Sequence, residues 1–146
     1  MKLLAMILLQ AHSYSAIEAK DGEKCAIQFI DAIDENLRPE HKDKLMPIVA
    51  AIRYAENGGP GREYGIIHKR AKTYRDQAGW CAKTVQNDYD EWLKSDRKME
   101  FLKYLATQYA PIGVDNDPNG LNKHWYKNVL HWQKRIIKGV FKELGI

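Results

Sequence analysis

Apolar residues recur at three- and four-residue steps along almost the whole chain, and this spacing predicts helices rather than strands. The predicted helices cover about 23–37, 39–56, 76–95, 99–109 and 122–143. Two long loops, 57–75 and 110–121, separate them, and Pro47 implies a kink in the second helix or a start close to it. The length of 146 residues fits one domain. Because there is no run of 18 apolar residues, we expect no membrane-spanning helix. The sequence therefore predicts a compact all-α domain over 20–146.

The segment 1–19 supports two interpretations. One positive charge precedes seven apolar residues, and small residues follow, as in a minimal secretion signal cleaved after Ser15 or Ala19. Such a signal would send the protein to the periplasm or cell wall. The alternative is a buried N-terminal helix in a protein that stays cytoplasmic until it is released. Cys25 and Cys81 would form a disulfide in an exported protein and remain free core thiols in a reducing compartment.

The positive charge is concentrated at the C-terminal end of the chain. Of the net charge of +4, residues 121–146 supply +5, from six Lys and Arg against Glu143, so the other 120 residues carry −1. Cations on a helix suit binding to phosphates. No helix-turn-helix or RNA-binding motif accompanies them, however, and Trp125 and Val129 begin an apolar face. We therefore expect no nucleic-acid partner, but a solvated face that can contact an anionic envelope.

The most informative residue is Glu56, which ends an apolar helix and is followed at once by Asn57-Gly58-Gly59. Since that helix faces the core, the carboxyl starts from a partly desolvated position, and desolvation raises the pKa of a carboxyl. A carboxyl that stays protonated near neutral pH can act as a general acid. The glycines let a substrate approach the backbone beside it. The alternative is a solvated glutamate before a turn, although the helix dipole disfavours a negative charge at this end.

This pattern resembles the lysozyme-like superfamily, particularly the soluble lytic transglycosylases and related peptidoglycan glycosidases. The resemblance lies in Glu56-Asn57-Gly58-Gly59 followed by Gly61-x-x-x-Gly65-Ile66, and in Tyr109-Ala110-Pro111 with Asp117-Pro118-Asn119, which looks like a region of bacterial glucosaminidases. It implies a lysozyme-like domain with two long active-site loops that cleaves the glycan strand of peptidoglycan. Glu56 would be the catalytic acid, and Tyr109, across the cleft from it, would orient the substrate N-acetyl group or help to stabilise the developing charge.

The chain departs from the family pattern at several positions. Asn57 stands where the family has Ser, Ile67-His68 stands where Met-Gln often follows the loop glycine, and the Asn-Ala-Gly motif is missing. The resemblance therefore leaves open which glycosidic bond is cleaved. It also leaves open whether the enzyme is a muramidase, a glucosaminidase or a lytic transglycosylase.

A glycosidase that works with two carboxylates needs a partner for Glu56. The candidates are Asp76, Asp88, Asp90, Asp115 and Asp117. Asp76 is equally suited to cap the helix that follows it, and Asp115 and Asp117 suit turns. The resemblance to the transglycosylases offers a route with a single glutamate, in which the N-acetyl group of the substrate is the internal nucleophile.

Aromatic and amide side chains in or beside the two loops suit a sugar-binding cleft, because rings stack on pyranose C–H faces and amides give directional hydrogen bonds. The candidate substrate-binding residues are Tyr64, Gly65, His68, Tyr74, Asp76, Trp80, Asn119, Asn122 and Trp125. No metal-ligand spacing is present, so we expect no metal and no cofactor. Two other functions stay open: a glycan- or partner-binding protein of the same fold without turnover, and a basic nucleic-acid-binding helical domain. We expect a monomer.

Overall fold

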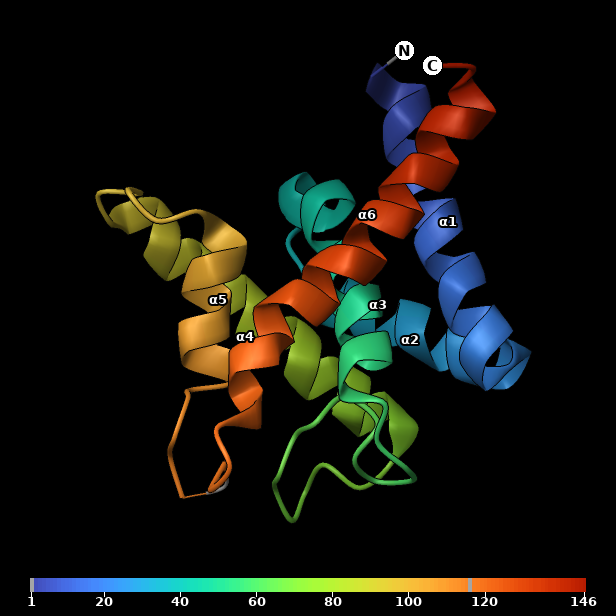
Figure 1. Cartoon of the computed structure of the whole chain (residues 1–146). Helices are drawn as coiled ribbons and strands as arrows, with labels where there is room; N and C mark the ends of the chain where they lie inside the picture. The colour runs from blue at the N-terminus through green and yellow to red at the C-terminus, as the bar shows by residue number, and fades with distance from the viewer. Residues whose placement is uncertain (1, 116) are drawn as a thin grey trace.

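The computed structural model describes residues 2–115 and 117–146, so Met1 of the N-terminal segment and Asn116 of the second loop lie outside the described residues. The elements are α1 (Lys2–Asp21), α2 (Glu23–Asn36), η1 (Pro39–His41), α3 (Lys42–Glu56), α4 (Tyr74–Lys94), α5 (Phe101–Tyr109), η2 (Leu121–His124) and α6 (Trp125–Leu144). These elements are all helical, and the described residues contain no strand, which confirms the all-α prediction (Figure 1).

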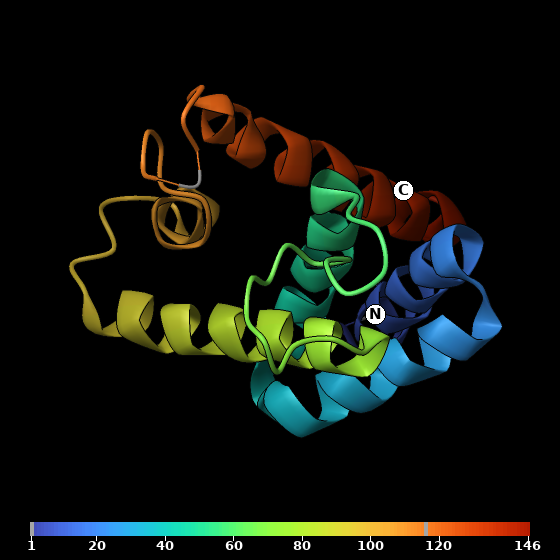
Figure 2. The ribbon, with the colours of Figure 1, turned by 90° about the horizontal axis from the view of Figure 1, so that it is seen from below.

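Helix α3 forms the centre of the molecule. Every residue from Leu45 to Arg53 is buried, and the helix packs against α1, α4 and α6. Figure 2 shows α3 running between α4 on one side and α6 on the other. The helix begins at Lys42 and continues through Pro47, so the proline neither starts nor ends it. Other helices surround α3 as far as Arg53, and its last residue therefore lies at the edge of the core.

The N-terminal segment is a helix of the domain in this structure. Helix α1 packs against α2, α3 and α6, and Ile17 is fully buried. The Tyr54 hydroxyl donates to the backbone oxygen of Ala16 at 2.6 Å, and His12 Nε2 lies 2.6 Å from the carboxylate of Glu143 on α6. No helix among the described residues has the length and apolar character needed to cross a bilayer.

Helix α4 begins at Tyr74, slightly earlier than predicted. Its cap is Thr73, whose hydroxyl oxygen accepts a hydrogen bond from the backbone N–H of Asp76 at 3.0 Å. The suggested capping role of Asp76 is therefore wrong, because Asp76 already lies in the first helical turn, where the cap binds its N–H. Both cysteines are free, with Cys25 half-buried and Cys81 buried in α4.

The two long loops lie at the same end of the molecule, where α3 and α5 end and α6 begins (Figure 1). The first follows α3 and covers residues 57–73, and the second covers 110–120 and leads into η2.

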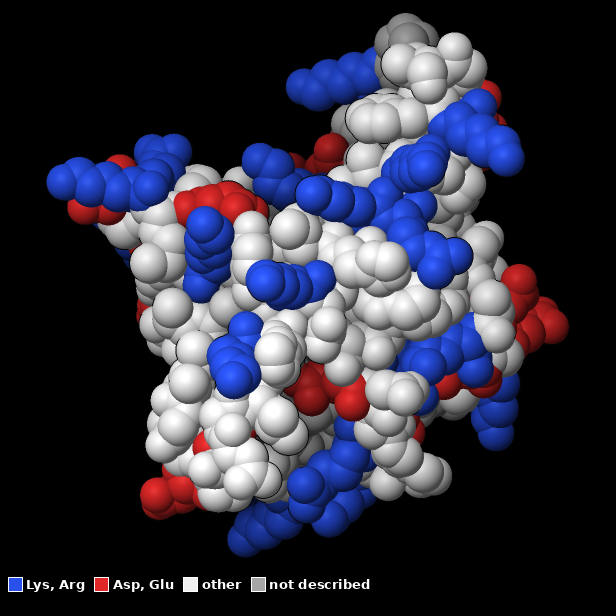
Figure 3. Space-filling view, in the orientation of Figure 1, with Lys and Arg blue, Asp and Glu red and all other residues white. Residues whose placement is uncertain are grey.

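The six cations of the C-terminal segment are all exposed, as predicted for a solvated face, and Figure 3 shows Lys and Arg side chains spaced along α6.

Candidate active site

Glu56 is the last residue of α3, and its carboxyl is held by an indole. Asn57 ends the helix in the left-handed conformation, at φ 48° and ψ 34°. Trp125, at the start of α6, donates from Nε1 to Glu56 Oε1 at 2.8 Å. Burial raises the pKa of Glu56, and the Trp125 hydrogen bond, which favours the charged form, lowers it by a smaller amount. The carboxyl therefore keeps its proton to a higher pH than an ordinary glutamate.

Gly65 closes the first loop over this carboxyl. Its φ is +75°, and a Cβ atom at this position would lie 2.4 Å from Glu56 Oε2. Only glycine allows both this backbone conformation and this approach. The prediction that Gly65 belongs to the site is thus supported by geometry, since its backbone contacts the Glu56 side chain directly.

Tyr109 joins the same group from the end of α5. Its ring stacks on Trp125, with 5.2 Å between centroids and 23° between planes. Its hydroxyl is buried and donates to the backbone oxygen of Tyr64. Burial raises the pKa of Tyr109 well above its ordinary value and that of the neighbouring Cys81 thiol to about 12. Both groups are therefore neutral at physiological pH, and the Tyr109 hydroxyl is bonded to the loop.

A hollow of about 200 Å³ lies beside these residues. Gly65, Ile66 and Ile67 of the first loop line one side, and Thr84 of α4 with Gln108 and Tyr109 of α5 line the others. Gly65 therefore lines the hollow and also contacts the Glu56 carboxyl. The candidate site thus combines a half-buried carboxyl with a hollow that shares Gly65 as a wall.

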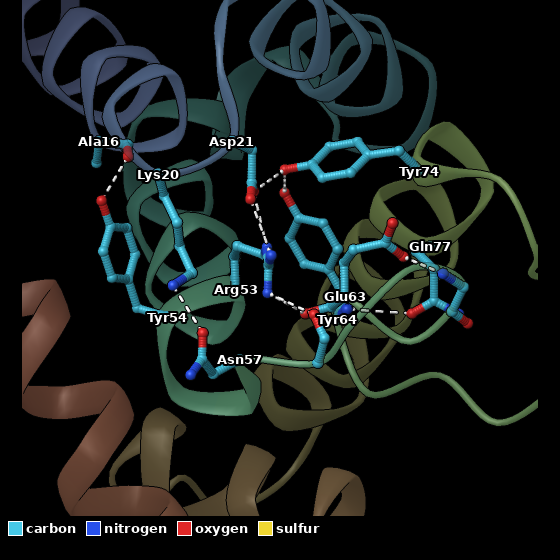
Figure 4. A network of polar contacts seen from close by, with 12 residues as sticks. Ala16, Lys20, Asp21, Arg53, Tyr54, Asn57, Glu63, Tyr64, Tyr74 and Gln77 are labelled. Carbon is cyan, nitrogen blue, oxygen red and sulfur yellow. Dashed lines mark hydrogen bonds and ion pairs between the residues drawn. The ribbon is translucent and has the colours of Figure 1, made fainter.

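A buried polar network lies behind the first loop and links it to α1 (Figure 4). Arg53 donates to both carboxylate oxygens of Asp21, at 2.7 and 2.8 Å. The Tyr74 hydroxyl donates to Asp21 at 2.7 Å and lies 2.8 Å from the Tyr64 hydroxyl. Tyr64 is fully buried, so its side chain is not available to a substrate. The structure assigns the Tyr64 and Tyr74 side chains to positioning the loop instead of binding sugar.

Two buried side chains, Arg53 and Gln77, bind the backbone of the first loop. Arg53 donates to the carbonyl oxygens of Gly58 and Glu63, at 3.2 and 3.1 Å. Gln77 Oε1 accepts from the N–H groups of Tyr64 and Ile66, and its Nε2 lies 2.7–2.9 Å from the carbonyl oxygens of Gly61, Ile66 and Ala71. These contacts fix the loop that carries Gly65.

Asp21, Arg53 and Gln77 are not among the site residues predicted from the sequence. A signal for two of them was present: Arg53 lies four residues after Val49, and Gln77 lies four residues before Cys81, both on apolar stripes. A polar side chain at such a position is buried and must find polar partners. Asp21 gave no comparable local signal, because its partner Arg53 is distant in the sequence.

The other predicted binding residues separate into two places. His68 and Trp80 stack on each other, with 4.4 Å between centroids, and Trp80 lines a second hollow together with Asp76. Asn122 donates from its amide to the backbone oxygen of Pro111 at 2.9 Å, so it organises the second loop. Asn119 is exposed in that loop.

Two of the candidate second carboxylates, Asp90 and Asp117, have partners other than Glu56. Asp90 pairs with Arg38, which lowers its pKa, and Asp117 accepts hydrogen bonds within its own loop. Asp88 is half-buried on α4, and burial, aided by Glu91, raises its pKa to about 6. In the described parts of the chain, no carboxylate contributes to the pKa of Glu56. No group of three or more potential metal ligands occurs among the same residues.

Comparisons with protein-family models, with curated proteins and with solved structures find no match to this chain.

Proposed function

We propose that this protein cleaves the glycan strand of peptidoglycan, with Glu56 as the general acid. The observation that carries the proposal is the Glu56 carboxyl itself: burial raises its pKa, Trp125 donates a hydrogen bond to it, and Gly65, which contacts it, lines a hollow. A general acid that is protonated near neutral pH can give its proton to the leaving oxygen as the glycosidic bond breaks.

The single-glutamate route is the version that the site supports best. A retaining enzyme with a carboxylate nucleophile places the two carboxyls about 5–5.5 Å apart, a spacing at which each charge would strongly affect the other's pKa. No such partner influences Glu56 in the described residues. The resemblance to lytic transglycosylases then implies that the substrate N-acetyl group attacks the anomeric carbon. Glu56, now a carboxylate, then takes a proton from an incoming hydroxyl, whose oxygen bonds to the anomeric carbon as the bond to the N-acetyl oxygen breaks.

Tyr109 and Trp125 act in this proposal by positioning. Trp125 holds one carboxylate oxygen of Glu56, and Tyr109 stacks on the Trp125 ring and binds the loop at Tyr64. The Tyr109 hydroxyl already donates to the Tyr64 oxygen, so in this proposal Tyr109 acts by holding the loop and the Trp125 ring. The exposed cations of α6 would add electrostatic attraction to the anionic envelope.

Substitution of the acid tests the proposal. Glu56→Gln keeps the size of the side chain and can still accept from Trp125, so we expect normal folding by circular dichroism. Clearing of purified peptidoglycan in a zymogram should fall by at least about 100-fold, the contribution typical of a general acid. Glu40→Gln, at an exposed position of η1, is the matched control and should leave clearing unchanged.

The products decide the reaction type, and two results would overturn the proposal. Mass spectrometry should find anhydro ends if a sugar hydroxyl attacks, and reducing ends if water attacks. Full clearing by Glu56→Gln would remove Glu56 from the chemistry. Glycan binding without any turnover by the unmodified protein would favour the binding-protein alternative.

A further inference from the structure

A second and larger hollow, of about 510 Å³, lies between α2 and α4. Its volume is in the range of small-molecule and oligosaccharide sites, which are about 300–1,000 Å³. The side chain of Asn36 enters it from α2, and Trp80, Thr84 and Asn87 line it from α4. Residues 80, 84 and 87 follow helical spacing, so their side chains share one face of α4.

The hollow contains the groups that carbohydrate recognition requires. Trp80 is 39% exposed, and His68 stacks on it at 4.4 Å, which fixes the ring as a platform. An aromatic face of this kind packs against the C–H groups of a pyranose. Thr84 and Asn87 offer hydroxyl and amide groups that can both donate to and accept from sugar hydroxyls, and Asn36, whose Nδ2 donates to the Ala32 oxygen at 2.9 Å, adds an amide oxygen that can accept.

The second hollow neighbours the hollow that Gly65 lines. Thr84 lines both hollows. On the loop side, Ile66 and Ile67 line the smaller hollow, and the next residue, His68, stacks on Trp80. A linear polymer bound at the smaller hollow can therefore extend along α4 toward the second one.

We propose that the α2–α4 hollow is a distal subsite for the same glycan strand, in which Trp80 stacks on an N-acetylated sugar several residues from the cleaved bond. This inference rests on the proposed function, since it extends the same substrate beyond the smaller hollow. It explains why the tryptophan is exposed at this position and why Asn36, Thr84 and Asn87 surround it. The subsite contributes binding and takes no part in bond cleavage.

Binding measured without turnover tests the subsite. In the Glu56→Gln background, calorimetric titration with a tetrasaccharide of β-1,4-linked N-acetylglucosamine should give a Kd that rises at least tenfold on Trp80→Ala. Asn87→Ala should weaken binding in the same direction. Phe141→Ala, which removes an aromatic ring that is 49% exposed on α6, is the control and should leave Kd unchanged.

Kinetics on two substrate lengths separate a distal subsite from the catalytic centre. With otherwise unmodified protein, Trp80→Ala should raise KM for long glycan strands by a larger factor than KM for a short fragment. The subsite would be overturned if Trp80→Ala raised KM equally for both substrate lengths. It would also be overturned if Trp80→Ala left the Kd unchanged, or if the tetrasaccharide did not bind. These outcomes are independent of whether Glu56→Gln abolishes clearing, so the subsite and the proposed acid can fail separately.

Discussion

Two opposing effects act on the carboxyl of Glu56, and their balance sets its pKa. Burial disfavours the charged form and raises the pKa. The position at a helix C-terminus acts in the same direction, because the dipole there disfavours an anion. The Trp125 indole opposes both by donating to Oε1 at 2.8 Å. Removing this one hydrogen bond is therefore a way to change the pKa of Glu56, the proposed acid, while keeping its carboxyl.

Trp125→Phe should raise the pKa of Glu56 further. The ring that stacks on Tyr109 is retained, while the N–H that favours the carboxylate is lost. Since a general acid works only while protonated, the alkaline limb of the pH–activity profile should move to higher pH. Carbon-13 NMR of the labelled carboxyl checks the pKa directly. Trp92→Phe is the control, because it removes a comparable indole donor, to the Met99 oxygen; an unmoved limb in Trp125→Phe would contradict the argument.

At the scale of elements, the site depends on how the first loop is held over the end of α3. The loop has no regular structure of its own, and its backbone groups bond to the buried side chains of Arg53 and Gln77. These bonds bring Gly65 against Glu56. The backbone of the loop thus packs against the Glu56 carboxyl at Gly65, and this close approach leaves no room for a side chain at residue 65.

Gly65→Ala and Gly113→Ala form a matched pair. Both glycines have φ +75°, so each alanine should cost about 1–2 kcal/mol of folding free energy from backbone strain. Only at Gly65 would the new Cβ collide with Glu56, whereas nothing lies within 4 Å at Gly113. Urea denaturation should therefore show similar losses of stability, or a somewhat larger loss for Gly65→Ala. Peptidoglycan clearing should fall only in Gly65→Ala, and an equal effect of both variants on clearing would count against the contact.

The sequence predicts most helices because the apolar spacing is local, and it predicts Glu56 because the glycine break follows it directly. The start of α4 was misplaced although its cap was present in the sequence, since the Thr73 hydroxyl bonds to the N–H of Asp76. Tyr64 and Tyr74 are predicted to bind substrate from their residue type and their place in or beside the first loop. The Tyr74 hydroxyl instead bonds to Asp21, far away on α1, and the buried Tyr64 hydroxyl lies 2.8 Å from that of Tyr74. Periodicity carries no information about such a distant partner.

At the scale of the whole molecule, α1 joins the site to the rest of the fold. Its C-terminal residue, Asp21, binds Arg53 and Tyr74 behind the first loop. Its middle packs into the core at Ile17, and His12 bonds to Glu143 of α6. Processing after Ala19 would take Ile17 out of the core and leave Asp21 without the helix that holds it. The placement of α1 is thus a property on which both stability and the loop depend.

Ile17→Ala tests this role against Ile7→Ala on the same helix. Ile17 is fully buried, so removing its outer carbons leaves a cavity and should cost about 2–4 kcal/mol of folding free energy. Ile7 is 54% exposed, and its truncation should cost less than about 1 kcal/mol. Urea denaturation followed by circular dichroism measures both.

Equal and small losses of folding free energy in the two variants would mean that α1 is not part of the cooperative unit. A large loss at Ile17 alone would place the N-terminal segment in the same folding unit as Arg53 and Glu56, because a single transition would then report on all of them.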